Sequence, residues 1–159
     1  MRWLRMLVLL VAVMLWGVFE RSVGVVPLFG LSLGACVACA FELRLGFSLL
    51  SGSLMLAAGE WIMGLPVGAW ALGGTLGLIA CHLVLHTARP GLLERAVALV
   101  MIVVPGLICS VAFGFATHGS TGIPGPLQTL FFLGTAFWVS APLIRWLHGA
   151  RREVWGQRS

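Results

Sequence analysis

The feature that most constrains this chain is a series of six apolar runs, each 17 to 21 residues long, separated by short polar or Gly/Pro-containing segments. At about 1.5 Å per residue, a helix of this length spans about 25 to 32 Å, which matches the ~30 Å hydrocarbon core of a bilayer. The composition, 60% hydrophobic and 9% charged, points away from a water-soluble domain. We therefore expect an all-α membrane protein with a six-helix transmembrane domain over residues 1–147 and a basic cytoplasmic tail at 148–159. The expected helices cover residues 3–19, 23–41, 45–65, 67–86, 96–116 and 127–147.

The arginines orient these runs, because cytoplasmic segments of membrane proteins accumulate Lys and Arg. With the N-terminus inside, nine of the ten arginines fall on the cytoplasmic side and only Arg21 falls outside. This sorting predicts six spans with both termini in the cytoplasm. One alternative stays open: a re-entrant third and fourth run would sort the arginines in the same way. No small-x-small cleavage site follows the first run, so we interpret it as an uncleaved anchor.

The sequence contains no motif for chemistry of its own. There is no H-E-x-x-H, no phosphate loop, no paired carboxylate and, without a single Asp, no Ser/His/Asp set. We therefore expect neither an enzyme nor a cofactor or metal. The net charge of +5 reflects topology rather than nucleic-acid binding, since no basic patch with interleaved aromatic residues occurs. Cys36 and Cys39 form a C-x-x-C spacing inside an apolar run, where thiols are expected to act as small packing residues.

Ionisable residues inside a membrane span are the default functional candidates, and Glu60, His82 and His86 are the ones in this chain. Glu60 lies near the outer end of the third run. Its open roles are a shallow interfacial carboxylate, an ion pair with Arg21 or His118, a contact to a lipid headgroup or a partner, and a protonated acid. His82 and His86 stand four residues apart on one helical face, a spacing that can ligate a metal or a haem but is also compatible with packing.

Small residues predict where helices approach one another, because close packing drives helix association in lipid. Gly30 and Gly34 form one G-x-x-x-G pair, and Gly73 and Gly77 form another. We expect these pairs to lie in buried seams. Pro105 and Pro142 fall inside the fifth and sixth runs, where neighbouring helices can satisfy the carbonyl groups that a proline frees.

The stretch from Leu45 to Leu85 resembles the rod shape-determining protein MreD, a small polytopic bacterial membrane protein. The resemblance rests on the glycine-rich run Gly46-Phe-Ser-Leu-Leu-Ser-Gly52, on Gly59-Glu60, and on Gly64-Leu-Pro66-Val-Gly68-Ala-Trp-Ala-Leu72. The family usually has Asp followed by a Leu-rich Ser-Gly segment where this chain has Glu60 and Gly64. Together with the intramembrane charge and the glycine spacing, this resemblance gives the candidate partner or packing sites Glu60, Gly64, Pro66, Gly68, Gly73, Gly77 and Arg21.

The resemblance implies a non-enzymatic scaffold of the cell-wall elongation machinery in the bacterial inner membrane. Such a scaffold binds MreC within the membrane and is linked to RodA, a class B penicillin-binding protein and the MreB filament. The basic tail, with Arg151, Arg152 and Trp155, is expected to lie along anionic lipid.

Two other functions remain open at this stage. MreD is itself similar to the substrate-binding subunits of energy-coupling-factor vitamin transporters, which would need a polar cavity open to the outside, lined by Glu60, Trp61 and His118. A haem-bearing membrane anchor would use His82 or His86.

Overall fold

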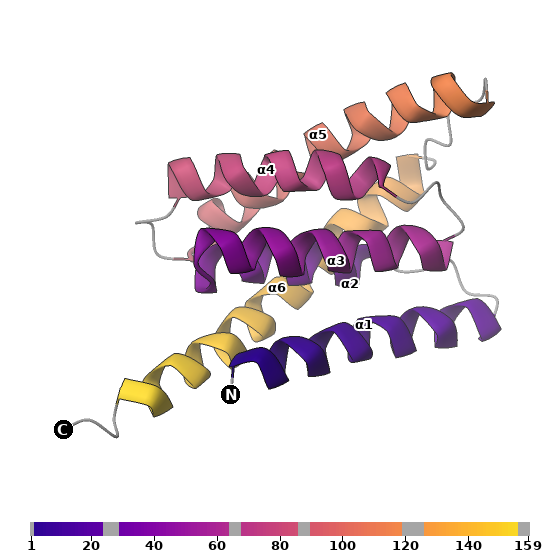
Figure 1. Ribbon diagram of the computed structural model, residues 1–159. Coiled ribbons are helices and arrows are strands. Elements are labelled where there is room, and N and C mark those ends of the chain that lie inside the picture. Colours follow the sequence, from indigo (N-terminus) through magenta and orange to yellow (C-terminus); the bar gives the residue numbers. More distant parts are fainter. Residues whose placement is uncertain (1, 24–28, 64–67, 86–89, 119–125, 156–159) are drawn as a thin grey trace.

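The computed structural model describes residues 2–23, 29–63, 68–85, 90–118 and 126–155, and these residues form six α-helices with no strand among them (Figure 1). Each helix contains a long apolar run, and these runs are separated at charged or Gly/Pro-containing segments. The helices are α1 (Arg2–Val23), α2 (Phe29–Glu42), α3 (Leu45–Met63), α4 (Ala69–Leu85), α5 (Leu92–His118) and α6 (Pro126–Trp155).

Successive helices run up and down, so the start of α1 and the end of α6 lie at the same end of the bundle (Figure 1). The starts of α3 and α5 and the ends of α2 and α4 lie at this end too. We call it the basic end, because it carries Arg5, Arg44, Arg95 and Arg145.

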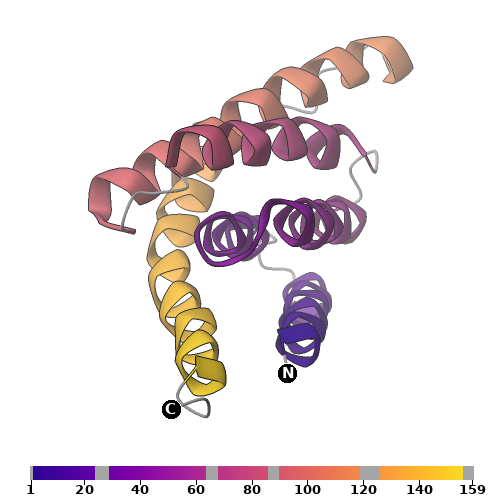
Figure 2. The same ribbon diagram turned by 60° about the vertical axis from the view of Figure 1, so that its left-hand side comes forward.

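The helices form tiers, with α4 and α5 on one side, α2 and α3 in the middle and α1 on the other side, while α6 runs along one flank (Figure 2). The tightest pairs are α4 with α5 and α2 with α6. The middle helix α2 contacts all five others, and residues 32–39 are buried without interruption. The core therefore surrounds α2.

The outer surface is apolar. Leu83 and Trp138 are 76% and 80% exposed, and α1 buries few large side chains, among them Leu9 and Val13. Such a surface suits lipid, which is as apolar as leucine. Within the described residues, three helices are long and apolar enough to cross a membrane, over Leu45–Ile62, Leu92–Phe113 and Leu130–His148. Shorter apolar stretches occupy Leu4–Trp16, Gly30–Glu42 and Ala69–Leu85.

Each expected run corresponds to one helix, but several ends differ. The fifth helix begins at Leu92 rather than at residue 96, because Glu94 and Arg95 are polar yet continue the helix. The sixth runs on to Trp155, so the first part of the expected tail is helical. The first helix runs on to Val23 rather than ending at residue 19, so the expected start of the second helix at residue 23 is instead the end of α1. Residues 24–28 lie outside the described part of the chain, and α2 is described from Phe29.

Candidate functional site

The Glu60 side chain ties the end of α3 to the start of α4. It is fully buried, and its carboxylate accepts hydrogen bonds from two backbone N–H groups across the connection. Oε2 accepts from the Gly68 N–H at 2.7 Å, and Oε1 accepts from the Trp70 N–H. N–H groups in the first turn of a helix have no acceptor within that helix. Glu60 is therefore an N-terminal cap for α4 that the preceding helix supplies.

Gly68 makes this cap possible. Its φ of 113° lies in the left-handed region, which side chains other than glycine's rarely allow. Its carbonyl accepts from the Leu72 N–H at 2.9 Å, which starts the α4 ladder. The Glu60 carboxylate also lies against the positive end of the α4 dipole, where negative charge is stabilised.

This geometry narrows the roles that the sequence leaves open for Glu60. The carboxylate is fully buried within the chain and each of its oxygens accepts a backbone hydrogen bond, so it offers a lipid headgroup no exposed oxygen. The side chains of Arg21 and His118, the two expected ion-pair partners, lie outside the described part of the structure, as do residues Gly64 and Pro66.

Gly73 and Gly77 face α5. A methyl group on Gly73 would overlap the backbone of Pro105 and Gly106, and one on Gly77 would overlap the backbone of Met101 and Ile102. Proline at position 105 has no N–H to give to the carbonyl four residues earlier, which is that of Met101. The absence of a side chain on Gly77 lets the α4 backbone cover this freed carbonyl.

The other G-x-x-x-G pair lies against α6. A methyl group on Gly30 would overlap Thr135 and the Phe132 carbonyl, and one on Gly34 would come within 2.9 Å of the Ala136 carbonyl oxygen. The two glycine pairs thus form the two tightest helix pairs of the fold, α4 with α5 and α2 with α6.

A regular antiparallel register joins α3 to α4. Glu60 contacts Trp70, Leu56 lies against Gly74, and Gly52 lies against Leu78. Each step of four residues toward the start of α3 therefore matches a step of four residues toward the end of α4. Ser48 on α3 and His82 on α4 stand one further step of four residues along this register.

Ser48 and His82 are the polar members of this register at the basic end. His82 Nε2 lies 3.1 Å from the Leu43 carbonyl oxygen, to which it can only donate. Within the described residues, its Nδ1 and the Ser48 hydroxyl are buried without a hydrogen-bond partner. His86, the other expected ligand, lies outside the described residues, so the His82/His86 pair is not placed.

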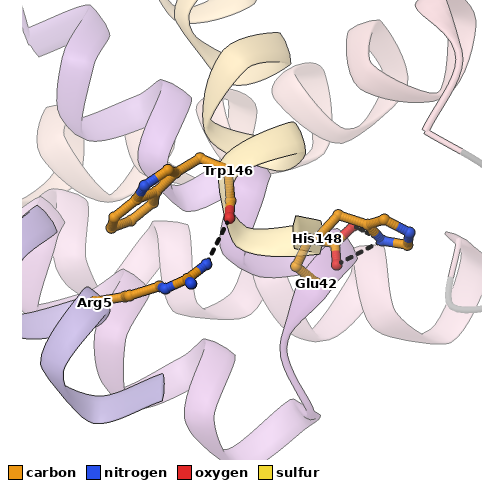
Figure 3. A network of polar contacts seen from close by, with 4 residues as sticks. All are labelled: Arg5, Glu42, Trp146 and His148. Carbon is orange, nitrogen blue, oxygen red and sulfur yellow. Dashed lines mark hydrogen bonds and ion pairs between the residues drawn. The ribbon is translucent and has the colours of Figure 1, made fainter. Parts of the chain in front are cut away.

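Side chains from three helices meet at the basic end (Figure 3). Arg5 of α1 donates to the Trp146 carbonyl at 3.1 Å and lies 5.7 Å from the centre of the Trp146 ring system. His148 of α6 pairs with Glu42, the last residue of α2, at 3.2 Å. These contacts hold α1 and α2 to the end of α6.

The cysteines occupy packing positions. Cys36 and Cys39 are fully buried in α2, and the Cys36 thiol donates to the Gly52 carbonyl at 3.2 Å. Cys81 donates to the Ala98 carbonyl at 3.6 Å. In the described part of the chain, no three His, Cys, Asp or Glu residues gather as a metal site.

Comparison with known proteins gives no relative: no family model, no curated protein and no solved structure matches this chain. The candidate site is therefore defined by its own geometry. It consists of the Glu60 cap, Gly68 at the start of α4, and the Gly73 and Gly77 seam on α5.

Proposed function

We propose that this chain is a non-enzymatic membrane scaffold of the MreD type, which spans the bacterial inner membrane six times and keeps both termini in the cytoplasm. Its role is to bind MreC and other wall-elongation proteins, RodA, a class B penicillin-binding protein and MreB, and so to support cell shape.

The observation that carries this proposal is the Glu60 cap. The segment that resembles MreD, from Gly59 to Leu72, forms a joint in which the buried carboxylate holds the next helix by its backbone. An ionisable group inside a membrane span is expensive and demands an explanation. For Glu60 the explanation is structural, because its carboxylate caps α4. A scaffold requires such a joint, and no substrate needs to be invoked.

The arrangement of the helix ends supports the proposed topology. Helices that alternate in direction bring the start of α1 and the end of α6 to one end (Figure 1), and the same end holds Arg5, Arg44, Arg95 and Arg145. An end that carries the basic residues faces the cytoplasm under the positive-inside rule. The tail residues Arg151 and Arg152 continue from this end and suit contact with anionic lipid.

A pull-down from native membranes tests the proposal. The tagged chain, extracted in mild detergent, is expected to recover MreC and at least one peptidoglycan synthase by mass spectrometry. A matched membrane protein of similar size and tag serves as the control. Recovery of neither protein above this control would contradict the scaffold function.

The vitamin-transporter alternative would need a polar cavity lined by Glu60, Trp61 and His118. Among the described residues, Trp61 lines a small groove of about 340 Å³ with Val18, Ser22 and Ile62, a lining that does not include Glu60, and the His118 side chain lies outside the described part of the structure. A small molecule retained through purification, together with a co-purified ATPase pair, would favour this alternative. A Soret band that is lost in His82→Ala would favour the haem-bearing anchor instead.

A further inference from the structure

We propose that the groove between α1 and α3 binds one acyl chain of an anionic phospholipid of the cytoplasmic leaflet, with the lipid phosphate at Arg44. The groove has a volume of about 430 Å³, within the range of about 300–1,000 Å³ found for small-molecule sites. Leu4, Leu7 and Leu10 of α1 and Phe47, Leu50 and Leu54 of α3 form most of its lining. This inference rests on the proposed six-span topology but not on the MreD-type scaffold role.

The residues that line the groove are almost all apolar, so they suit an apolar occupant. The one polar side chain of the lining is Ser51, whose hydroxyl already donates to the Phe47 carbonyl of its own helix. A polar ligand would therefore find only the Ser51 hydroxyl oxygen as a side-chain hydrogen-bond partner there. Leu50, Leu54 and Leu7 are also 51%, 49% and 59% exposed, so the groove opens to the surroundings of the helix bundle.

The length of the groove fits a lipid chain better than a partner helix. Its α3 side runs from Phe47 to Met55, which is about 12 Å at 1.5 Å per residue. One leaflet of the hydrocarbon core is about 15 Å deep, half of the ~30 Å total. A groove that starts at the basic end and stops near the middle of the bilayer therefore matches one leaflet, whereas a spanning helix would need a groove across both.

The groove also has few of the residues that helix docking uses. Close approach of helices in lipid depends on small side chains, and Ser51 is the one small residue in the lining, which holds no glycine or alanine. The small residues face other helices within the chain instead, such as Gly73 and Gly77 against α5. Flexible Leu, Met and Phe side chains suit a flexible chain of methylene groups.

Arg44 supplies the charge that selects an anionic headgroup. It directly precedes α3, and its carbonyl accepts from the Ser48 N–H at 2.9 Å, so it stands at the end of α3 where the groove begins at Phe47. The side chain is exposed, and no ion pair joins it to another described residue. A phosphate there would lie at the cytoplasmic surface while its acyl chain enters the groove.

Native mass spectrometry of the purified chain titrated with phosphatidylglycerol or phosphatidylethanolamine measures this selectivity. The unaltered chain is expected to bind phosphatidylglycerol more tightly, and Arg44→Gln should reduce that preference about fivefold, the worth of one arginine near a lipid headgroup. Arg145→Gln is the control, because Arg145 is an exposed arginine at the same end on α6. Equal preferences in both variants would overturn the assignment of Arg44.

A second pair of variants tests the groove itself. Leu50→Trp places a ring in the groove and should weaken binding of both lipids, whereas Leu76→Trp, on an exposed position of α4, should leave it unchanged. A photo-crosslinking residue in place of Leu54, activated in native membranes, should yield a lipid adduct. A protein adduct at this position, or unchanged binding in Leu50→Trp, would overturn the proposal. These outcomes are separate from recovery of MreC, which tests the scaffold function.

Discussion

The cap that Glu60 provides predicts that this one side chain contributes measurably to stability. In Glu60→Ala, the N–H groups of Gly68 and Trp70 lose their acceptors and stay in the protein interior. A hydrogen bond to a charged group contributes about 1.5–3 kcal/mol in water-soluble proteins, and side-chain hydrogen bonds in a bilayer average about 0.6 kcal/mol. For two such bonds at one buried carboxylate we expect a loss of about 2–4 kcal/mol in the free energy of unfolding.

Glu60→Gln separates the cap from other roles. The glutamine amide keeps one oxygen acceptor but presents an NH₂ donor to the second backbone N–H. Glu60→Gln should therefore lower the free energy of unfolding by about 1–2 kcal/mol, about half of the loss expected for Glu60→Ala. The measurement is reversible unfolding by dodecyl sulfate in mixed micelles, followed by tryptophan fluorescence. Glu94→Gln is the matched control; Glu94 lies in the first turn of α5, and the expected change is within about 0.5 kcal/mol.

The result that would refute this reasoning is a Glu60→Ala variant as stable as the unaltered chain, within about 0.5 kcal/mol. Glu60 would then serve a partner or a proton rather than α4.

Other predictions use the same unfolding assay. Gly77→Ala should lower the free energy of unfolding by about 1–3 kcal/mol, because the added methyl group would overlap the α5 backbone. Gly134→Ala, where nothing lies within 4 Å of the added methyl group, should be neutral or stabilising. Equal effects of the two substitutions would contradict close packing of α4 on α5. Gly68→Ala should cost about 1–2 kcal/mol, since an L residue is strained at a φ of 113°; an unchanged stability would refute this. Ser48→Ala should be neutral or slightly stabilising, because it removes a buried hydroxyl without a described partner. His82→Leu should lower the free energy of unfolding by about 1 kcal/mol, because it removes the hydrogen bond to the Leu43 carbonyl. A larger loss in Ser48→Ala than in His82→Leu would contradict these roles.

The sequence predicts the helices well, because runs of apolar residues of near-bilayer length interrupted by Gly, Pro or charge have few other solutions. It places helix ends less well, since hydropathy and helicity are different properties. Glu94 and Arg95 are polar yet helical, and α6 continues through Arg151 and Arg152 for the same reason. A helix ends where its backbone can no longer continue, which need not be where its apolar character ends.

The candidate site was predictable as a set of residues but not as a set of contacts. Intramembrane charge indicated Glu60, but its acceptor role depends on backbone N–H groups, which every sequence has and which leave no residue signature. The nearest signal is Gly68, eight residues later, at the start of the next apolar run. The same holds for His82, whose partner is the Leu43 carbonyl. The spacing of Gly73 and Gly77 indicated a seam, but only the fold shows that α5 fills it.

The proposed six-span topology underlies both the scaffold and the lipid site, and cysteine accessibility in intact cells and inverted vesicles tests it most directly. Single cysteines are introduced at Arg44, Ala88 and Gly149 for one side and at Val25, Leu65 and Ile123 for the other, and each is labelled with a membrane-impermeant maleimide. The unaltered chain gives the background from its native cysteines. We expect the first three to label only from the cytoplasmic side and the last three only from outside. Labelling of position 65 from the cytoplasmic side would show that α3 and α4 do not both cross the membrane and would contradict the proposed topology.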